Sequence, residues 1–296
     1  MSNPKISIGM PIYNGASYID QAINSVLNQT FKDFELIISD NASTDNTENI
    51  CKKYLSLDNR IHYLRQKKNI GGINNFKFVL DSSVGKYFMW LAADDALGNA
   101  NFLKLLNDKI SEKYDFYFPE VSIINYKNEV MKSNTMQSFS RLNTKIDFLK
   151  VSLDQNSQQL YSLFTKSKLI EDWKYLETCK NLKHCNEGLF VHAINATRNG
   201  CFVIDALKFY RYHKSNWASK VSGKNLILSQ MIYALKSIKF ILGLNELLFF
   251  KKIQFSIKIF FTSFKAIVYY ALNRLWHKLG FEKFRLLKKI INKLRT

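Results

Sequence analysis

The first 95 residues alternate short apolar segments with segments whose apolar residues recur at helical spacing, and this rhythm limits the possible folds more than any other feature. The predicted strands are Lys5–Ile12, Phe34–Ser39, Arg60–Arg65 and Lys86–Leu91. Three helices are predicted between them: one from Ile19 to Leu27, a second that follows the polar turn Asp40–Asp45 and ends at Tyr54, and a third from Gly71 to Leu80. Strands that alternate with helices pair mainly in parallel and are covered on both faces. The sequence therefore predicts an α/β fold, with a mainly parallel sheet flanked by helices.

After Asn101 this rhythm loosens. A helix and a strand-like stretch from Tyr114 to Tyr126 are followed by polar segments, which we interpret as an elaboration on an edge of the sheet. From Leu226 onward the chain is apolar and rich in lysine, with no proline, and should be helical. We predict one domain over residues 1–222 and a basic helical tail over residues 223–296.

Positive charge is concentrated in that tail. The chain carries a net charge of +19, and residues 225–296 alone hold 14 basic and 2 acidic side chains. An anionic partner is expected, which could be nucleic acid, a phosphorylated substrate or a membrane surface. Lysines interrupt both long apolar stretches of the tail, so neither offers the ~20 apolar residues of a spanning helix. We expect helices that lie on an anionic membrane surface; the alternative is a helical cap within the protein or between subunits.

Cysteine spacing and the N-terminus indicate a reducing compartment. The four cysteines lack C-x-x-C spacing, and we interpret them as free thiols. The first apolar run, Ile6–Ile12, is too short for the core of a signal peptide. We expect a cytoplasmic protein, peripheral on the inner face of the cell membrane.

Polar residues follow each predicted strand. They are Tyr13 and Asn14, then Asp40 and Asn41, then Lys67, Lys68, Asn69 and Gly71, and finally Asp94 and Asp95. Ligands bind at the carboxyl ends of strands in open α/β sheets, so the four connections predict one binding edge. The alternative for any single connection is an ordinary turn.

Adjacent carboxylates directly after an apolar strand carry the most chemical information. Asp94 and Asp95 would repel each other unless they are solvated or share a cation, and hard oxygen ligands suit Mg²⁺ or Mn²⁺ bound to phosphates. This pair predicts metal-assisted chemistry on a diphosphate. Alternatively, Asp95 caps a helix that begins near Asn99.

Several short motifs occur together in one order. They are Pro11-Ile-Tyr-Asn14, Ser25-Val-Leu-Asn-Gln-Thr-Phe31, Asp40-Asn-Ala-Ser-Thr-Asp45, Asn69-Ile-Gly71, Ala92-Ala-Asp-Asp95, Asn186-Glu-Gly-Leu-Phe190 and Tyr210-Arg-Tyr-His213. In this order and spacing the chain resembles the family 2 glycosyltransferases, inverting enzymes of the Rossmann-like GT-A fold, over roughly its first 215 residues.

The resemblance implies a nucleotide site. Asp40 would accept a hydrogen bond from the pyrimidine imide of a UDP- or dTDP-sugar. The wall of that base pocket would be formed by Pro11, Tyr13 and Asn14, and Lys68 and Asn69 would also bind the nucleotide.

The resemblance also implies a metal and a catalytic base. Asp95 would be the main ligand of Mn²⁺ or Mg²⁺, and Asp94 would contact the ribose or the metal. Glu187 would take the proton of the acceptor hydroxyl; a capping role is the alternative. On a flexible loop, Arg211 and His213 would act on the diphosphate or the metal, although His213 could be an ordinary surface histidine.

The resemblance thus implies transfer of a single sugar from a nucleotide-sugar donor to a saccharide or polyprenyl-diphosphate-linked acceptor, in bacterial surface polysaccharide (O-antigen or capsule) biosynthesis. The Gln-x-x-Arg-Trp pattern of processive synthases is absent. A catalytically inactive nucleotide-sugar-binding scaffold is the alternative. Nucleic-acid binding would explain the charge, but no recognition motif of that class is present, so no nucleic-acid partner is expected.

Overall fold

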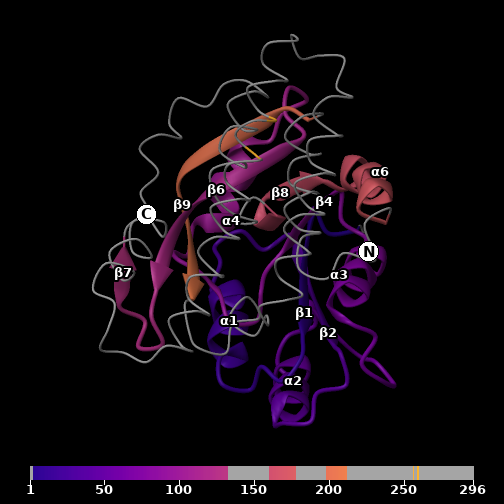
Figure 1. The fold of residues 1–296 in the computed structure, drawn as a ribbon. Helices are drawn as coiled ribbons and strands as arrows, with labels where there is room; N and C mark the ends of the chain where they lie inside the picture. Colours follow the sequence, from indigo (N-terminus) through magenta and orange to yellow (C-terminus); the bar gives the residue numbers. More distant parts are fainter. Residues whose placement is uncertain (1–2, 133–159, 178–197, 212–255, 257–258, 260–296) are drawn as a thin grey trace, which may run out of the picture. The chain divides into compact units, whose positions relative to one another are not determined.

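A computed structural model describes residues 3–132, 160–177, 198–211, 256 and 259 (Figure 1). The elements are β1 (Ile6–Ile12), α1 (Ile19–Leu27), β2 (Phe34–Asp40), α2 (Thr47–Leu55), β3 (Ile61–Arg65), α3 (Gly72–Asp81), β4 (Tyr87–Trp90), β5 (Ala96–Leu97), α4 (Phe102–Lys109), β6 (Phe116–Ile124), β7 (Val130–Lys132), β8 (Leu163–Thr165), α6 (Lys166–Glu177) and β9 (Gly200–Arg211). Nearly all of the predicted tail lies outside the described residues, so the boundary at residue 222 stays a prediction.

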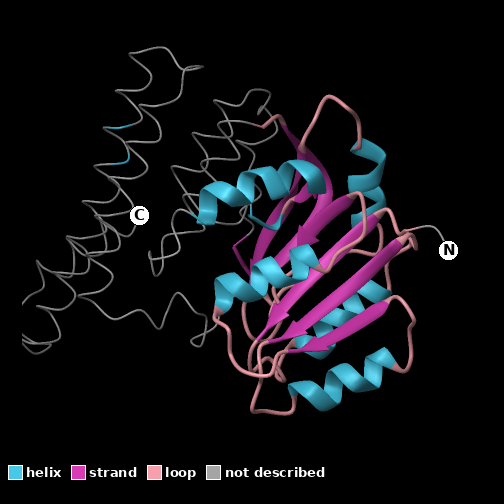
Figure 2. Cartoon of the chain, turned by 90° about the vertical axis from the view of Figure 1, so that its right-hand side faces the viewer, coloured by secondary structure: helices cyan, strands magenta, loops and turns pink. Residues whose placement is uncertain are grey.

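One mixed sheet joins the described strands in the order β3-β2-β1-β4-β8-β6-β9-β5, with β7 paired to β6. Figure 2 shows this sheet with helices packed against it. The pairs β3–β2, β2–β1 and β1–β4 are parallel, as the alternation of strands and helices predicts. Strand β8 then pairs antiparallel with β4 and β6, whereas β9 pairs parallel with β6. The α/β fold with helices against a largely parallel first half is confirmed, and the second half extends the same sheet.

The two faces of β1 are buried against different helices. Ile6, Ile8, Met10 and Ile12 belong to the core cluster that includes α1, α2 and α4. On the opposite face, a Cβ atom at Gly9 would lie only 2.6 Å from the Phe88 ring and 2.8 Å from Val79 of α3, so the sheet and that helix approach closely.

A second set of apolar contacts surrounds Trp90, the last residue of β4. The centre of its ring lies 4.9 Å from the centre of the Phe88 ring and 5.7 Å from that of the Trp173 ring of α6. Its Nε1–H donates to the Phe76 carbonyl of α3 at 3.1 Å. This packing fixes the end of β4, and therefore the start of the connection that carries Asp94 and Asp95.

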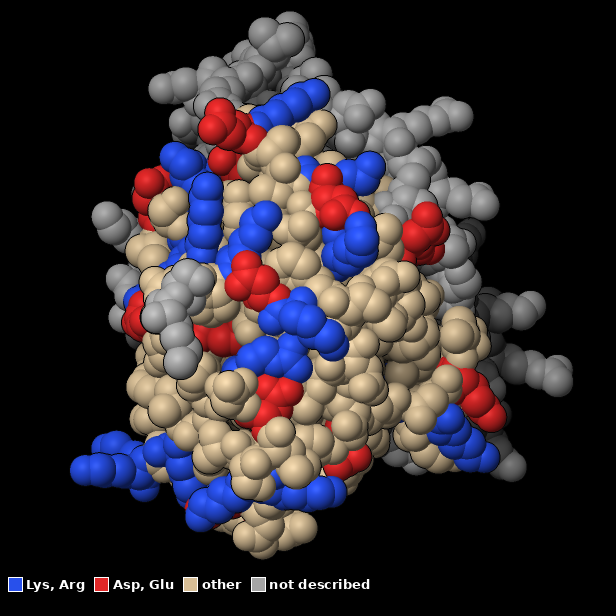
Figure 3. All heavy atoms as spheres, turned by 180° about the vertical axis from the view of Figure 1, so that it is seen from behind, with Lys and Arg blue, Asp and Glu red and all other residues tan. Residues whose placement is uncertain are grey.

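Charges on the described surface are mixed. Figure 3 shows basic and acidic side chains interspersed over most of one face, and ion pairs one helical turn apart occur on α2 (Glu48–Lys52), α3 (Lys77–Asp81) and α4 (Lys104–Asp108). Within the described residues, no helix is long and apolar enough to span a bilayer.

Candidate active site

The loop after β1 is tied to the loop after β2. Asn14 takes a left-handed backbone conformation with φ of 54°, which asparagine tolerates. Its N–H donates to Ser43 Oγ at 2.9 Å, and its Oδ1 accepts from the Thr44 N–H at 2.7 Å. The neighbouring Tyr13 is 50 % exposed, and Pro11 is half-buried beside Ser39. The loop therefore presents the Tyr13 ring on a backbone that is hydrogen-bonded to the loop after β2.

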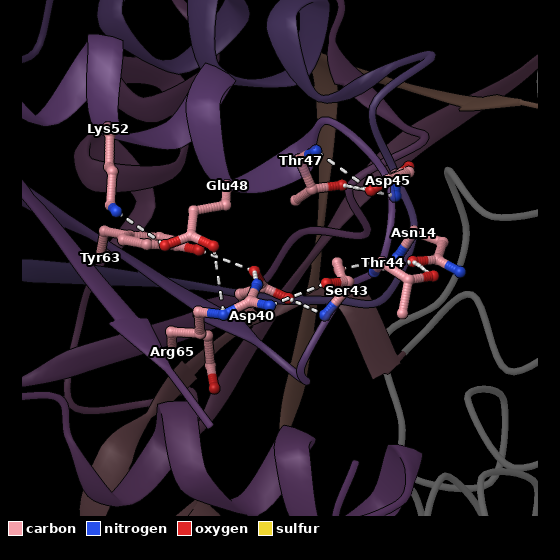
Figure 4. A network of polar contacts seen from close by, with 12 residues as sticks. Asn14, Asp40, Ser43, Thr44, Asp45, Thr47, Glu48, Lys52, Tyr63 and Arg65 are labelled. Carbon is pink, nitrogen blue, oxygen red and sulfur yellow. Dashed lines mark hydrogen bonds and ion pairs between the residues drawn. The ribbon is translucent and has the colours of Figure 1, made fainter. Parts of the chain in front are cut away.

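Asp40 ends β2 and is completely buried, with 0 % exposure. Its Oδ1 accepts from the Ser43 N–H at 2.7 Å, and its Oδ2 accepts from the Tyr63 hydroxyl at 2.7 Å and forms an ion pair with Arg65 (Figure 4). Burial raises the pKa of Asp40, but the hydrogen bonds from Ser43 and Tyr63 and the charge of Arg65 outweigh it and lower the pKa overall.

This arrangement bears on the expected contact between Asp40 and a pyrimidine. A carboxylate has about four lone-pair positions, and three protein donors already use three of them. In this structure the side chain fastens the loop after β2 to strand β3 and does not reach the surface. The contact with the base stays a prediction.

The connection after β3 is organised by two asparagines. Asn69 Oδ1 accepts from Asn41 Nδ2 at 3.1 Å and from the Gly71 N–H at 2.9 Å, and Asn41 Oδ1 accepts from the Ile70 N–H at 2.8 Å. Gly71 has φ of 84°, a conformation that favours glycine. The preceding Lys68 is exposed. The loops after β1, β2 and β3 thus form one hydrogen-bonded edge, as the sequence predicts.

Asp95 is buried, with 1 % exposure, whereas Asp94 is half-buried. One oxygen of Asp95 forms an ion pair with the Lys208 ammonium of β9, and the other accepts from the Arg211 N–H at 3.0 Å. Burial raises the pKa of Asp95, and the Lys208 charge opposes this rise. Asp95 does not cap α4, whose N-cap residue is Asn101.

In this structure both oxygens of Asp95 are held by β9, and its expected role as the main metal ligand stays a prediction. Asp94, the other described residue of the expected ligand set, is half-buried. No group of three or more His, Cys, Asp or Glu side chains with metal-binding geometry occurs among the described residues.

Arg211 is also placed differently from the expectation, which put it on a flexible loop beside the diphosphate. It ends β9 and is 1 % exposed. Its guanidinium donates to the Asp94 carbonyl at 2.8 Å, Asn125 O at 3.1 Å, Asn128 Oδ1 at 2.6 Å and Gln21 Oε1 at 2.6 Å. Four protein acceptors therefore hold Arg211 inside the fold. Glu187 and His213 lie outside the described residues.

Lys208 and Gln21 were not foreseen as part of this region. The signal for Lys208 is a lysine inside a strand-like run, Ala206-Leu-Lys-Phe-Tyr210, where alternate residues are buried. Such a lysine needs a buried acid, and Asp94-Asp95 is the acidic pair that follows another buried strand. Gln21 carries no signal of this kind, because a glutamine on an amphipathic helix is ordinary.

Comparisons with known proteins identify the family of the chain. The family model described as "Glycosyl transferase family 2" matches residues 7–169, more than half of the chain. The chain is 32 % identical over 177 residues to the Campylobacter jejuni "GalNAc(5)-diNAcBac-PP-undecaprenol beta-1,3-glucosyltransferase", covering 59 % of this chain and 55 % of that protein. It is 33 % identical over 113 residues to the Bacillus subtilis "Putative teichuronic acid biosynthesis glycosyltransferase TuaG", covering 38 % of this chain and 42 % of TuaG. These matches thus span about half the length of the two relatives.

Solved structures show the same fold. Residues 1–349 of S. aureus TarS, in complex with UDP-GlcNAc, superpose with a TM-score of 0.65 at 17 % identity, covering 98 % of this chain and 80 % of that TarS chain. The mannosyltransferase PcManGT of Pyrobaculum calidifontis, in complex with GDP-Man and Mn²⁺, gives a TM-score of 0.57 at 12 % identity, covering all of this chain and 85 % of PcManGT. The match of the family model over more than half of the chain, together with this fold, shows that the chain belongs to glycosyl transferase family 2.

Proposed function

We propose that the protein transfers one sugar, with inversion, from a UDP- or dTDP-sugar to a lipid-linked saccharide in the biosynthesis of a bacterial surface polysaccharide. The observation that carries the proposal is the edge formed by the connections after β1 to β4, where three loops are joined by hydrogen bonds and the fourth ends in Asp94 and Asp95. The names of the C. jejuni relative and of TuaG support a polyprenol-linked acceptor and a polysaccharide product.

The nucleotide would lie against the exposed part of this edge. Tyr13 offers a ring face for a base, with Pro11 and Asn14 beside it, and the ammonium of Lys68 offers a charge for a phosphate. Asn69 would act through the loop that it shapes. The UDP-GlcNAc bound in TarS supports a uridine donor, whereas the GDP-Man bound in PcManGT makes a guanosine donor the alternative to test.

Transfer requires a base on one side of the sugar and a stabilised leaving group on the other. Glu187 would take the proton of the acceptor hydroxyl while that oxygen bonds to the anomeric carbon and the bond to the diphosphate breaks. A divalent ion, when bound, would neutralise charge on the departing diphosphate. For that ion we propose Asp94 and His213 as ligands.

The first experiment is a screen of UDP-, dTDP- and GDP-sugars for binding to the full-length protein and for hydrolysis or transfer, with Mn²⁺, with Mg²⁺ and with a chelator. We expect one uridine or thymidine donor to bind and turn over, and the chelator to abolish turnover. Turnover that survives the chelator would overturn the metal requirement. Binding of a donor without turnover, on any saccharide acceptor, would favour the inactive scaffold.

The second experiment concerns the base. Glu187→Gln should keep donor affinity and lose about 10²–10⁴-fold in transfer rate, because proton abstraction contributes a factor of that size. Glu112→Gln, a change at an exposed residue after α4, is the matched control and should transfer at the parental rate. If Glu187→Gln also transfers at the parental rate, another acid is the base.

The basic tail is the basis for a proposed location on the inner membrane surface. The full-length protein should sediment with anionic vesicles and be released only partly as salt rises, because screening weakens the attraction of lysines but not apolar burial. A chain that ends at Ser222 should still bind the donor but not sediment. Failure of the full-length protein to bind vesicles at low salt would favour the helical cap.

A further inference from the structure

Lys208 is a lysine that the sheet buries completely, with 0 % exposure. Its ammonium forms an ion pair with the equally buried Asp95 and lies 4.3 Å from the centre of the Tyr161 ring. The two partners of the ion pair are 113 residues apart in the chain. The Lys208 ammonium therefore links the segment that follows β4 to strand β9.

Strand β9 holds that connection at further points. The Arg211 N–H donates to the second oxygen of Asp95, and the Arg211 guanidinium donates to the Asp94 carbonyl. Directly after Asp95, β5 pairs with β9 so that Leu97 faces Lys208, and the Gly98 N–H donates to the Leu207 carbonyl at 2.6 Å. The backbone on both sides of Asp95 is therefore set by β9.

Stability alone does not account for this ion pair. Two apolar side chains of similar volume are often at least as stable in a protein interior, because desolvation offsets most of the attraction between buried charges. An ion pair differs from an apolar pair in that it accepts one geometry. Here that geometry turns the Asp95 carboxylate into the sheet, while its neighbour Asp94 stays half-buried at the edge.

We propose that Lys208 is a positioning residue for sugar transfer: by holding Asp95 inside the sheet, it sets the place of Asp94 at the donor-binding edge. The inference rests on the proposed function, in which Asp94 acts on the donor diphosphate through a divalent ion. In this inference Asp95 supports the site without binding the ion. The inference also predicts that the negative charge of Asp95 is needed for transfer only while Lys208 carries its positive charge.

Three variants test this dependence. Lys208→Gln and Asp95→Asn each leave one buried charge without its partner. Each variant should lower kcat by about 100-fold, because a small displacement of a reacting group has an effect of that size. Each should also raise the Mn²⁺ concentration that gives the half-maximal rate. In the double variant Asp95→Asn/Lys208→Gln, the two amides can hydrogen-bond to each other. It should recover most of both losses. If Asp95 itself binds the metal, the double variant will be as inactive as Asp95→Asn.

A matched control and a measurement without variants complete the test. The double variant Asp108→Asn/Lys104→Gln removes an exposed ion pair of α4 and should leave all constants at their parental values. A crystal structure of the parental protein with UDP and Mn²⁺ decides the case in which the double variant does not fold. Asp95 paired to Lys208 would support the inference, and Asp95 turned onto Mn²⁺ would overturn it. A parental protein that transfers no sugar contradicts the proposed function instead, and the same crystal structure still tests the pairing.

Discussion

Asp40→Ala should destabilise the protein whether or not a nucleotide is bound. The substitution removes the acceptor of the buried Ser43 N–H and of the Tyr63 hydroxyl, each 2.7 Å away. A buried donor left without an acceptor costs about 1–3 kcal/mol, so the two together should lower the free energy of unfolding by about 2–6 kcal/mol. The side chain of Arg65 is one-third exposed and regains water, so its ion pair adds little.

Urea denaturation of Asp40→Ala and the parental protein, followed by circular dichroism, measures this difference. Tyr63→Phe removes the hydroxyl together with its need for an acceptor, so it should cost less than Asp40→Ala. Asp108→Ala, at the exposed ion pair of α4, should change the free energy of unfolding by less than about 0.5 kcal/mol. An equally small change for Asp40→Ala would refute the structural role. If Tyr63→Phe keeps donor affinity while Asp40→Ala loses it in a folded protein, the predicted contact with the base gains support.

Two further predictions concern packing and pH. Gly9→Ala places a Cβ atom 2.6 Å from the Phe88 ring and 2.8 Å from Val79, and overpacking of this kind costs about 1–3 kcal/mol, so the melting temperature should fall. In the control Gly72→Ala the new Cβ atom has no neighbour within 4 Å, and the melting temperature should not fall. Equal melting temperatures for the two variants would contradict the close approach of α3 to the sheet. The folded-state pKa of Asp40 lies below its ordinary value of 3.8, so its carboxylate stabilises the fold above that pH, and this contribution is lost as the pH falls through the folded-state pKa. The loss of stability between about pH 5 and about pH 3 should therefore be smaller in Asp40→Ala than in the parental protein, and urea midpoints at the two pH values measure it.

The first half of the sheet could be predicted from the sequence because its signals are local. Strands β1 to β4 are β-branched or aromatic runs, and the helices between them show apolar residues at helical spacing. Each predicted bound of these strands and helices differs from the observed one by no more than one residue. Their polar ends meet at one edge because parallel strands place their carboxyl ends together.

The second half depended on pairings that no local pattern encodes. Strand β8 has three residues, and it is a strand because it fits between β4 and β6. The burial of Asp95 could not be predicted for the same reason: a carboxylate after a strand can face a metal or the interior, and a lysine far along the chain decides which. The place of Arg211 was also not predicted: the family motif assigns this residue to a loop, whereas in the structure it ends strand β9.

The order of strands in the sheet also has a consequence for synthesis on the ribosome. Strands β1 to β4 and their helices are complete once the chain has passed Trp90, but the partners of Asp95 and the Asp94 carbonyl arrive with Lys208 and Arg211. At ordinary rates of translation this delay is on the order of 10 seconds. During that interval Asp95 has no counter-ion from β9, and until Thr165 has been made the edge of β4 has no β8. The first half of the sheet therefore acquires its final form only when most of the described chain has been made.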